Sequence, residues 1–245
     1  MGKIITVWSH KNNMGVTFTA TNLALSMAKE QKDKKVLLLD LNFSNPQVLQ
    51  YLVLNQDNKN INNILSYAIS EKISEENIIN NSDEVEGLFV VKGNKAPTIN
   101  DITDYKKIEI ILDNARNYFD YIIVDVNSYV NYSATYAALD ISDIVLHIAK
   151  RETFNMLSYN MSTKEIYRVF NYNKFYTIFN NDTLTMDTSE NEIMELIDLQ
   201  ILGSLPTLSN IGKRLAKFGI KNIKSKEMQE YNNGMKHIIN FLLDK

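Results

Sequence analysis

Short apolar runs alternate along the chain with longer segments in which apolar residues recur every three or four positions. Several runs, such as "VLLL" and "YIIV", are apolar at every position, which is typical of strands buried on both faces. The runs predict strands at Lys3–Ser9, Lys35–Asp40, Leu88–Val91, Tyr121–Asp125, Ile144–Ile148, Phe175–Phe179 and Gln200–Ser204. The periodic segments predict helices around Ala20–Ala28 and at Asp104–Tyr118, Thr153–Val169, Glu190–Leu196, Ser209–Phe218 and Lys226–Leu243. This alternation predicts an α/β fold, a doubly wound and mostly parallel sheet with helices on both faces.

Nothing in the sequence divides the chain into separate units. No internal repeat, low-complexity linker or break in composition occurs along its 245 residues. The polar segments Asn55–Asn63 and Asn80–Glu86 predict surface loops within the fold. We therefore expect a single domain that spans residues 1–245.

The composition excludes several kinds of chemistry. The chain has no cysteine, which rules out disulfides, thiolate zinc sites, iron–sulfur clusters and cysteine nucleophiles. No apolar run approaches the roughly 20 residues of a membrane-spanning helix, and the N-terminus shows no secretion signal, so we expect a cytoplasmic protein. A formal net charge of −3 argues against general affinity for nucleic acids, although a local basic patch stays compatible with it.

The segment "HKNNMGVTF" lies between the first predicted strand and the first predicted helix, where ligands bind in open α/β sheets. A helix N-terminus offers unpaired N–H groups and a partial positive charge, which together bind phosphate. The common phosphate-binding loop reads G-x-x-x-x-G-K-[ST], with the lysine on the phosphates and the hydroxyl on Mg²⁺. Here Gly15 and Thr17 match that pattern, but Val16 occupies the lysine position.

The segments around this loop extend the pattern. Lys11 stands five residues before Val16, and the chain continues through "KKVLLLDLNFSNP", "NYFDYIIVDVNS", "ISDIVLHIAKRE", "FYTIFNN" and "LGSLPTLSNIGKRLAKFG". This order resembles the ParA/MinD family of P-loop ATPases, whose variant loop reads K-G-G-x-G-K-[ST]. The residues aligned with that loop are Lys11, Asn12, Asn13, Met14, Gly15, Val16, Thr17 and Phe18. The resemblance covers nearly the whole chain.

The resemblance implies a P-loop NTPase-like fold that binds ATP with Mg²⁺ and forms a homodimer. It implies that Lys11 reaches the phosphate bound by the other subunit and acts in catalysis together with Asp40. The implied nucleotide-binding residues are Lys11, Asn12, Asn13, Met14, Gly15, Val16, Thr17 and Phe18, with Asn180 and Pro206 near the adenine. The implied Mg²⁺ ligands are Thr17, Asp40 and Asp125.

The departures from the family pattern bear on activity. Asn12 and Asn13 replace two glycines, although asparagine tolerates positive φ better than most residues. The Val16 side chain cannot donate to phosphate, and losing one charge-assisted hydrogen bond costs roughly 1.5–3 kcal/mol, or about ten- to a hundredfold in affinity. Asn42 replaces a second acidic residue that helps to activate the attacking water in MinD-like relatives. We therefore expect ATP hydrolysis to be very slow or absent.

Each candidate residue also has a purely structural interpretation. Lys11 could be a solvated loop lysine, and Thr17 could cap the helix that follows it. Asp40 and Asp125 could be turn residues, and turn chemistry explains Asn180 nearly as well as a contact with adenine. The three histidines are scattered in the sequence without ligand spacing, so no metal other than Mg²⁺ is assigned.

The C-terminal quarter of the chain suggests two further surfaces. Six basic residues lie between positions 213 and 226, namely Lys213, Arg214, Lys217, Lys221, Lys224 and Lys226. ParA relatives bind DNA non-specifically through such residues, whereas the alternative, which we favour, is a solvated helix face. The segment "MKHIINFLLDK" invites comparison with the membrane tail of MinD, but its apolar spacing favours a packed final helix, so a membrane partner is not expected.

Among the family's functions, the lack of cysteine removes the iron–sulfur carriers. The C-terminus has Tyr231 alone and no cluster of tyrosines, which argues against a tyrosine autokinase. Positioning proteins remain, among them the TadZ/CpaE-like branch of pilus-assembly proteins and proteins linked to plasmids or conjugation. We favour a dimer, nucleotide-dependent or constitutive, that recruits a protein partner and hydrolyses ATP slowly or not at all. A weak DNA-partitioning ATPase and a pseudo-ATPase scaffold without nucleotide are the alternatives.

Overall fold

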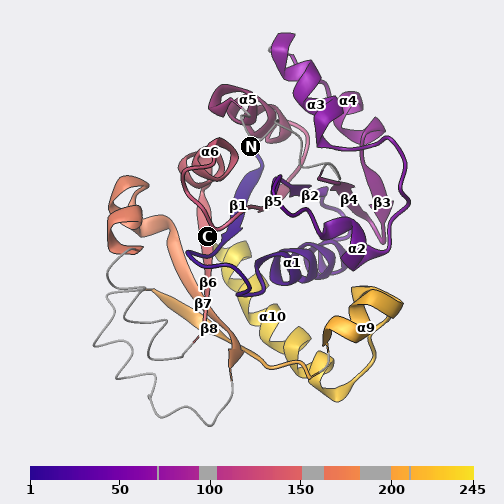
Figure 1. Cartoon of the computed structure of the whole chain (residues 1–245), viewed down its shortest axis with the longest axis vertical. Helices are drawn as coiled ribbons and strands as arrows, with labels where there is room; N and C mark the ends of the chain where they lie inside the picture. The colour runs from indigo at the N-terminus through magenta and orange to yellow at the C-terminus, as the bar shows by residue number, and fades with distance from the viewer. Residues whose placement is uncertain (71, 94–103, 151–162, 183–199, 210) are drawn as a thin grey trace.

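The computed structural model describes residues 1–70, 72–93, 104–150, 163–182, 200–209 and 211–245. Eight strands form one sheet in the order β3-β4-β2-β5-β1-β6-β7-β8 (Figure 1). The strands are β1 (Lys3–Trp8), β2 (Val36–Asp40), β3 (Asp83–Val85), β4 (Leu88–Val91), β5 (Tyr121–Asp125), β6 (Ile144–Ala149), β7 (Phe175–Asp182) and β8 (Ile201–Pro206). Every pair of neighbours is parallel except β3 and β4 at one edge. The predicted fold class is therefore confirmed.

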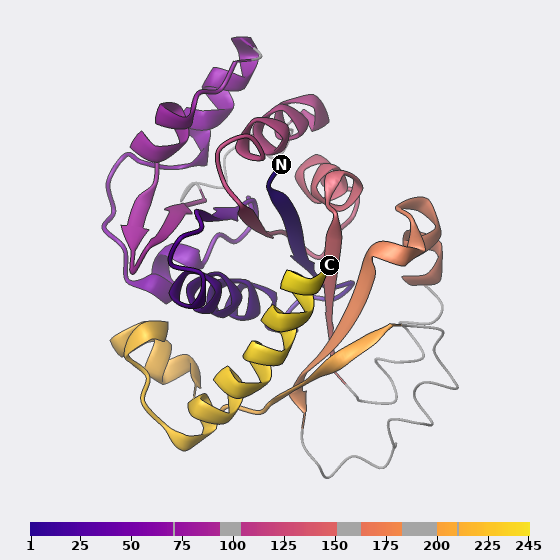
Figure 2. The same ribbon diagram turned by 180° about the vertical axis from the view of Figure 1, so that it is seen from behind.

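Helices cover both faces of the sheet, as Figures 1 and 2 show. One face carries α1 (Val16–Glu30), α2 (Val48–Leu52), α9 (Ile211–Phe218) and α10 (Lys226–Asp244). The other carries α3 (Ile61–Tyr67), α4 (Glu75–Asn80), α5 (Tyr105–Ala115), α6 (Ser133–Ile141) and a helix at residues 163–169. The 3₁₀ turns are η1 (Ala68–Ser70), η3 (Tyr172–Lys174) and η4 (Ile220–Asn222).

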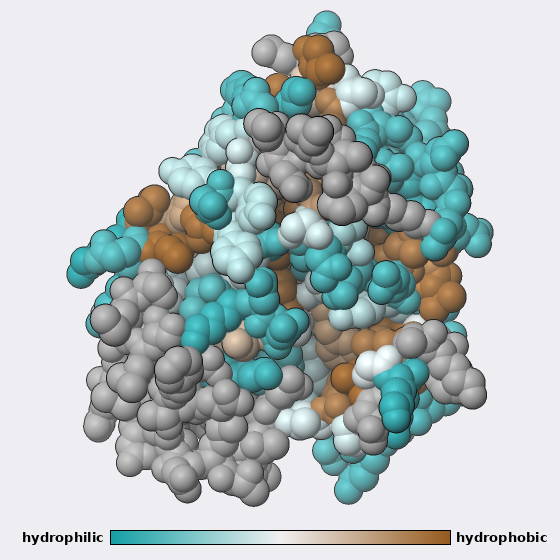
Figure 3. Space-filling view, in the orientation of Figure 1, coloured by the Kyte–Doolittle hydropathy of each residue, from teal (hydrophilic) through white to brown (hydrophobic). Residues whose placement is uncertain are grey.

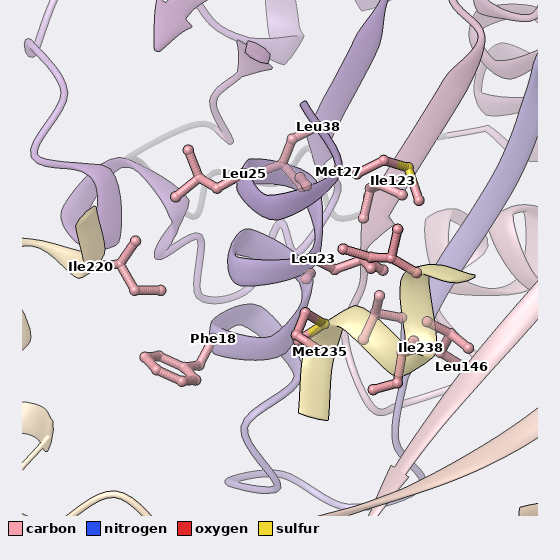
Figure 4. Packing of buried hydrophobic residues seen from close by; sticks show 14 of the residues in the cluster. Phe18, Leu23, Leu25, Met27, Leu38, Ile123, Leu146, Ile220, Met235 and Ile238 are labelled. Atoms are coloured by element: carbon pink, nitrogen blue, oxygen red, sulfur yellow. The ribbon is translucent and has the colours of Figure 1, made fainter. Parts of the chain in front are cut away.

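The apolar runs supply two hydrophobic cores, one on each face of the sheet. On β1, Ile5 lies in the core beneath α1 and α10, whereas its neighbour Ile4 lies in the opposite core. In the first core, Leu23 of α1 belongs to the same buried cluster as Met235 and Ile238 of α10 and Ile123 of β5 (Figure 4). The continuous apolar pattern arises because successive side chains of a strand point to opposite faces, and both faces are covered here.

The C-terminal helix packs on the body of the protein. Ile238, Ile239 and Leu242 of α10 are buried, and Leu243 is half-buried. No helix in the described residues is long and apolar enough to cross a membrane. Figure 3 shows hydrophilic residues over much of the coloured surface, with the exposed hydrophobic residues in separate patches.

Two loop predictions are wrong. The segment Asn80–Glu86 contains the edge strand β3, and Asn55–Asn63 runs into α3, for which Asn60 is the N-cap. The helices α2, α3, α4 and α6 are also absent from the predicted set, because elements of five to nine residues show too few turns for a clear period. The predicted helix Glu190–Leu196 lies outside the described residues, as does most of Thr153–Val169, although residues 163–169 are helical.

Candidate functional site

The loop between β1 and α1 is held in a conformation that depends on two residues with positive φ. Asn13 has a φ of 63°, and Gly15, the N-cap of α1, has a φ of 88°. A Cβ at Gly15 would lie 2.2 Å from Nδ2 of Asn180. That Nδ2 donates a hydrogen bond of 2.8 Å to the carbonyl oxygen of Met14. Asn180, which is buried on β7, therefore fixes the loop at the start of the helix, and only glycine fits there.

The first turn of α1 is suited to an anion. No side chain caps this helix, and its first turn contains no acidic residue. A helix N-terminus presents N–H groups without intrahelical acceptors and carries a partial positive charge. The backbone can thus bind phosphate even though Val16 has no side-chain donor.

Two buried aspartates lie at the carboxyl ends of neighbouring strands. Asp40 of β2 and Asp125 of β5 are register partners, and both are fully buried. Burial raises the pKa of Asp40 to about 7, although hydrogen bonds from backbone N–H groups oppose the rise. Two of those bonds come from Val48 and Asn42, each at 3.2 Å, so Asp40 also anchors the loop that follows its own strand.

Asp125 has fewer hydrogen bonds than Asp40 to offset the cost of its burial. Burial and then the charge of Asp40 hold the pKa of Asp125 well above its ordinary value. The Thr17 hydroxyl is close enough to lower that pKa in part, but neither Asp125 oxygen completes a hydrogen bond of normal geometry with a described residue. A buried carboxylate in this state is stabilised by a cation.

The donors around Asp125 fit Mg²⁺. Asp40, Asp125 and the Thr17 hydroxyl offer hard oxygen ligands, which Mg²⁺ prefers. The described residues contain no group of three or more His, Cys, Asp or Glu side chains arranged around a metal. Mg²⁺ commonly takes one or two carboxylates and completes its shell with water and substrate phosphates, so this small donor set is sufficient. When bound, the ion neutralises charge on the phosphates.

A cavity of about 520 Å³ opens beside these residues. It is lined by Asn12, Asn13, Gly15, Val16, Thr17, Asn42, Ser44, Asn45, Gln47, Tyr51, Val126, Asn127, Ser128, Tyr129 and Tyr132. None of these lining residues is charged at neutral pH. The structure therefore brings Asn12, Asn13, Gly15, Val16 and Thr17 together around a polar but uncharged cavity.

The other candidate residues do not line the cavity. Met14 and Phe18 are buried in the hydrophobic core beneath α1, so only their backbone atoms are available to a ligand. Lys11 is half-buried in the loop but is not among the lining residues. Asn180 lies against the loop, and Pro206 ends β8.

Sequence comparison places the chain in a family. A family model described as an AAA domain, AAA_31, matches residues 2–182, which include the loop, both aspartates and Asn180. The chain belongs to this AAA domain family. A comparison with curated proteins finds no significant match.

Solved structures share the fold of this AAA domain protein. A ParA family ATPase from Chlorobium tepidum TLS has a TM-score of 0.83 and 16% identity, covering 97% of this chain and 100% of that one. A putative plasmid partition protein from Borrelia burgdorferi B31, bound to AMPPNP, has a TM-score of 0.75 and 20% identity, covering 100% and 99%. The septum site-determining protein MinD from Pyrococcus horikoshii OT3, complexed with Mg-ADP, has a TM-score of 0.78 and 16% identity, covering 99% and 98%. The predicted ParA/MinD-type P-loop ATPase fold is confirmed.

In this member of the AAA domain family, uncharged side chains join the loops around the cavity. Nδ2 of Asn127 donates to Oδ1 of Asn42 at 3.3 Å and also to the Ser44 hydroxyl. Nδ2 of Asn12 donates to the Tyr129 hydroxyl at 3.3 Å. The loops after β1, β2 and β5 are therefore linked to one another by amides and hydroxyls.

The sequence interpretation missed much of this lining. Ser44, Asn45, Gln47, Tyr51, Asn127, Ser128, Tyr129 and Tyr132 were not predicted as site residues. One signal was available, because loops that follow parallel strands lie at the edge where ligands bind. The polar stretch "VNSYVNY" directly follows β5 and meets that condition.

Two of the three histidines are not scattered in the fold. Nδ1 of His10 and Nε2 of His147 are 3.1 Å apart, and Nδ1 of His147 is 3.0 Å from the Tyr167 hydroxyl. Burial, and then the charge of Lys11, lower the pKa of His10 to about 4. Burial also holds the pKa of His147 well below its ordinary value, so both rings are neutral at pH 7. This chain of contacts supports the start of the loop from beneath, and distant residues supply it.

Proposed function

We propose that this AAA domain protein binds ATP together with Mg²⁺, hydrolyses it slowly or not at all, and acts as a dimer that positions or recruits other proteins. One contrast within the site carries the proposal. Of the residues suited to the metal, Thr17 lines the cavity, and Asp40 and Asp125 are buried against the lining residues Asn42 and Thr17. In contrast, the lysine position is Val16, and no charged side chain lines the cavity.

Binding rests on the backbone and on the metal. The N-terminus of α1 attracts phosphate, and Mg²⁺ between the phosphates and Asp125 supplies the positive charge that Val16 lacks. The absent lysine costs roughly 1.5–3 kcal/mol, which lowers affinity about ten- to a hundredfold. We therefore expect binding to be weakened but not abolished.

The residues of the site support hydrolysis of ATP less well than they support its binding. Asn42 cannot accept a proton from water, and its Oδ1 accepts a hydrogen bond from Asn127. Both Asp40 oxygens accept bonds from backbone N–H groups, which assigns that carboxylate to holding the loop. Phosphoryl transfer depends on positioning and on neutralising developing charge, and this site is poor in both.

The positioning role and the dimer rest on the fold. Structural relatives are named for plasmid partition and septum-site determination. By that analogy the chain marks a place for pilus assembly or for a plasmid or conjugation system, with Lys11 acting across the dimer and Asn180 and Pro206 near the base. A fold-level analogy of this kind sets an expectation, and the site has to be tested directly.

Calorimetric titration with ATP tests the site. Wild type is titrated with Mg²⁺ present and again with a chelator, and each titration is repeated on Asp125→Asn and on the exposed control Asp113→Asn. We expect metal-dependent binding by wild type and by the control, and none by Asp125→Asn. Sedimentation of the same samples reports dimer formation. Brisk Mg²⁺-dependent release of phosphate would overturn the proposed lack of turnover.

The amide links across the cavity favour a second candidate, a pseudo-ATPase scaffold. The contacts of Asn127 and Asn12 join the loops without any ligand. A scaffold of this kind dimerises in the absence of nucleotide and shows no heat of binding at millimolar ATP in the titration above.

The basic residues favour a third candidate, a weak DNA-partitioning ATPase. Lys213, Lys221, Lys224 and Lys226 are exposed, and Arg214 lies 3.7 Å from Glu227. This candidate requires duplex binding that weakens with salt and falls when Lys213, Arg214 and Lys217 are replaced by alanine.

A further inference from the structure

A second hollow lies at the far end of α1 from the cavity. It has a volume of about 310 Å³ and is bounded by the last turns of α1, by η4 and by the first half of α10. Leu25, Ile220 and Met228 are among its apolar lining residues and form a floor that is continuous with the hydrophobic core. Its lining on α1 begins at Asn22, five residues or roughly 7.5 Å of helix beyond Thr17, and no residue lines both this hollow and the cavity.

Three lysines surround this floor. Lys29, Lys221 and Lys236 line the hollow, and Glu30 is its one acidic lining residue. Lys29 forms an ion pair of 2.9 Å with Glu86. Lys221 and Lys236 are exposed, and neither forms an ion pair with a described residue. We call this site the basic groove.

The charge around the basic groove differs from that of the whole chain. Residues 211–236 contain seven lysines or arginines and two glutamates, although the chain as a whole has a net charge of −3. Positive charge is therefore concentrated in the segment that runs from α9 through η4 into the first half of α10. Such segregation attracts an acidic partner to this surface, and it does so more weakly as salt increases.

We propose that the basic groove binds an acidic peptide segment of a partner protein. A large apolar side chain of that segment covers the floor, and carboxylates within about four residues of it reach Lys221 and Lys236. Duplex DNA fits less well. Its phosphates would contact the lysines but leave the apolar floor uncovered, and the edges of its bases cannot enter a hollow of this size. The inference is independent of nucleotide binding at the cavity.

Peptide display supplies the probe. A random dodecapeptide library displayed on phage is selected on wild type and depleted on the double variant Lys221→Glu/Lys236→Glu. We expect the enriched peptides to carry a large apolar residue with Asp or Glu within four positions of it. Enrichment of peptides without acidic residues, or no enrichment after depletion, overturns the proposal.

A labelled enriched peptide is then measured by fluorescence anisotropy in 100 mM and 300 mM salt. We expect affinity to fall at least tenfold in the double variant, while the control Lys72→Glu/Lys107→Glu, on the opposite face of the sheet, leaves it unchanged. Added salt should weaken the interaction without abolishing it, because the apolar contact is insensitive to screening. Equal affinity for both variants, or displacement of the peptide by a 20-base-pair duplex at equal concentration, contradicts a peptide groove.

Discussion

The cavity and the basic groove lie at opposite ends of α1 and differ in how they handle charge. The cavity is lined by uncharged residues, and the two aspartates beside it, Asp40 and Asp125, are fully buried and do not line it. The groove has three exposed lysines around an apolar floor, and only Lys29 forms an ion pair with a described residue. The positive side chain expected beside a phosphate is missing at one end of the helix, and positive side chains gather at the other.

The two regions therefore differ in the free energy that their charged groups cost. A buried carboxylate is expensive in its charged form, so the cavity is sensitive to protons and to cations. An exposed lysine keeps its charge in water at almost no cost in free energy. Each exposed lysine also contributes little to binding on its own, so the groove depends on several acting together. Gly219 directly precedes the groove residue Ile220 and lies against α2, because a Cβ there would lie 2.5 Å from Val53 and 3.1 Å from the carbonyl oxygen of the cavity residue Tyr51.

The largest expected effect is on the cavity side and concerns pH. Burial raises the pKa of Asp40 in the folded state from 3.8 to about 7. The neutral carboxyl therefore stabilises the fold at low pH, and that contribution is lost as pH rises through about 7. Relative to Asp40→Asn, we expect the unfolding free energy of wild type to fall by on the order of 3–4 kcal/mol between pH 4 and pH 8.

Urea denaturation at several pH values, with a chelator present, measures that difference. The lowered pKa values of the histidines affect both proteins equally and cancel. Asp125 acts in the same direction, because its pKa is raised by burial, which both proteins share, and then by the charge of Asp40, which only wild type carries. A difference that stays constant or grows with pH would show that Asp40 is not buried as described.

A smaller effect is expected at the turn that shapes the cavity. In Gly15→Ala, a Cβ at a φ of 88° meets Nδ2 of Asn180 and breaks its bond to Met14. We expect a loss of about 2–3 kcal/mol from backbone strain and the broken hydrogen bond. The control Gly212→Ala, near the groove side in α9, has no neighbour within 4 Å of the new Cβ and should change stability by at most about 1 kcal/mol. Thermal unfolding of both variants makes the comparison, and equal losses would refute it.

A lysine at position 16 restores the positive charge that the cavity lacks and tests whether the cavity binds phosphate. Val16→Lys places an ammonium at the start of α1, where it can donate to phosphate. We expect ATP to bind about ten- to a hundredfold more tightly, or by roughly 1.5–3 kcal/mol, in the calorimetric titration. The control Val169→Lys adds the same charge at an exposed, remote site and should leave affinity unchanged. If both variants bind ATP as wild type does, the cavity is not a phosphate site.

The smallest effect is expected at Val53, which lies beside Gly219. Val53 ends α2 with a φ of 55°, a conformation that β-branched residues rarely adopt. Its side chain is 61% exposed, so little packing offsets the strain. We expect Val53→Asn to stabilise the protein by about 1 kcal/mol, as judged by urea denaturation, because asparagine tolerates the left-handed region. The exposed control Val169→Asn should change stability by less than about 0.5 kcal/mol, and a destabilised Val53→Asn would show that Val53 holds Gly219 in place.

The sequence by itself determined the central sheet and the location of the loop. Strands such as β1, β2, β5 and β6 are buried on both faces, and that leaves a continuous apolar signal in consecutive residues. The same signal ends at Asp40 and Asp125, which is why the apolar pattern alone predicts both carboxylates at one edge of the sheet. The phosphate-loop pattern needs only adjacent residues, and so Gly15, Val16 and Thr17 were also within reach.

Only the tertiary structure decided the rest. Asn60 caps α3, Val48 and Leu52 of α2 are buried in the hydrophobic core, and β3 pairs with β4. None of these stabilising contacts gives a periodic signal in so short a segment. The contacts of Asn127 with Asn42, and of His10 with His147, join residues more than 80 positions apart. The basic groove likewise combines the end of one helix with a turn and a helix nearly 200 residues later. Such sites form where several loops and helices come together in space. The sequence pattern of each segment is local, so it does not predict which distant segments will be its neighbours.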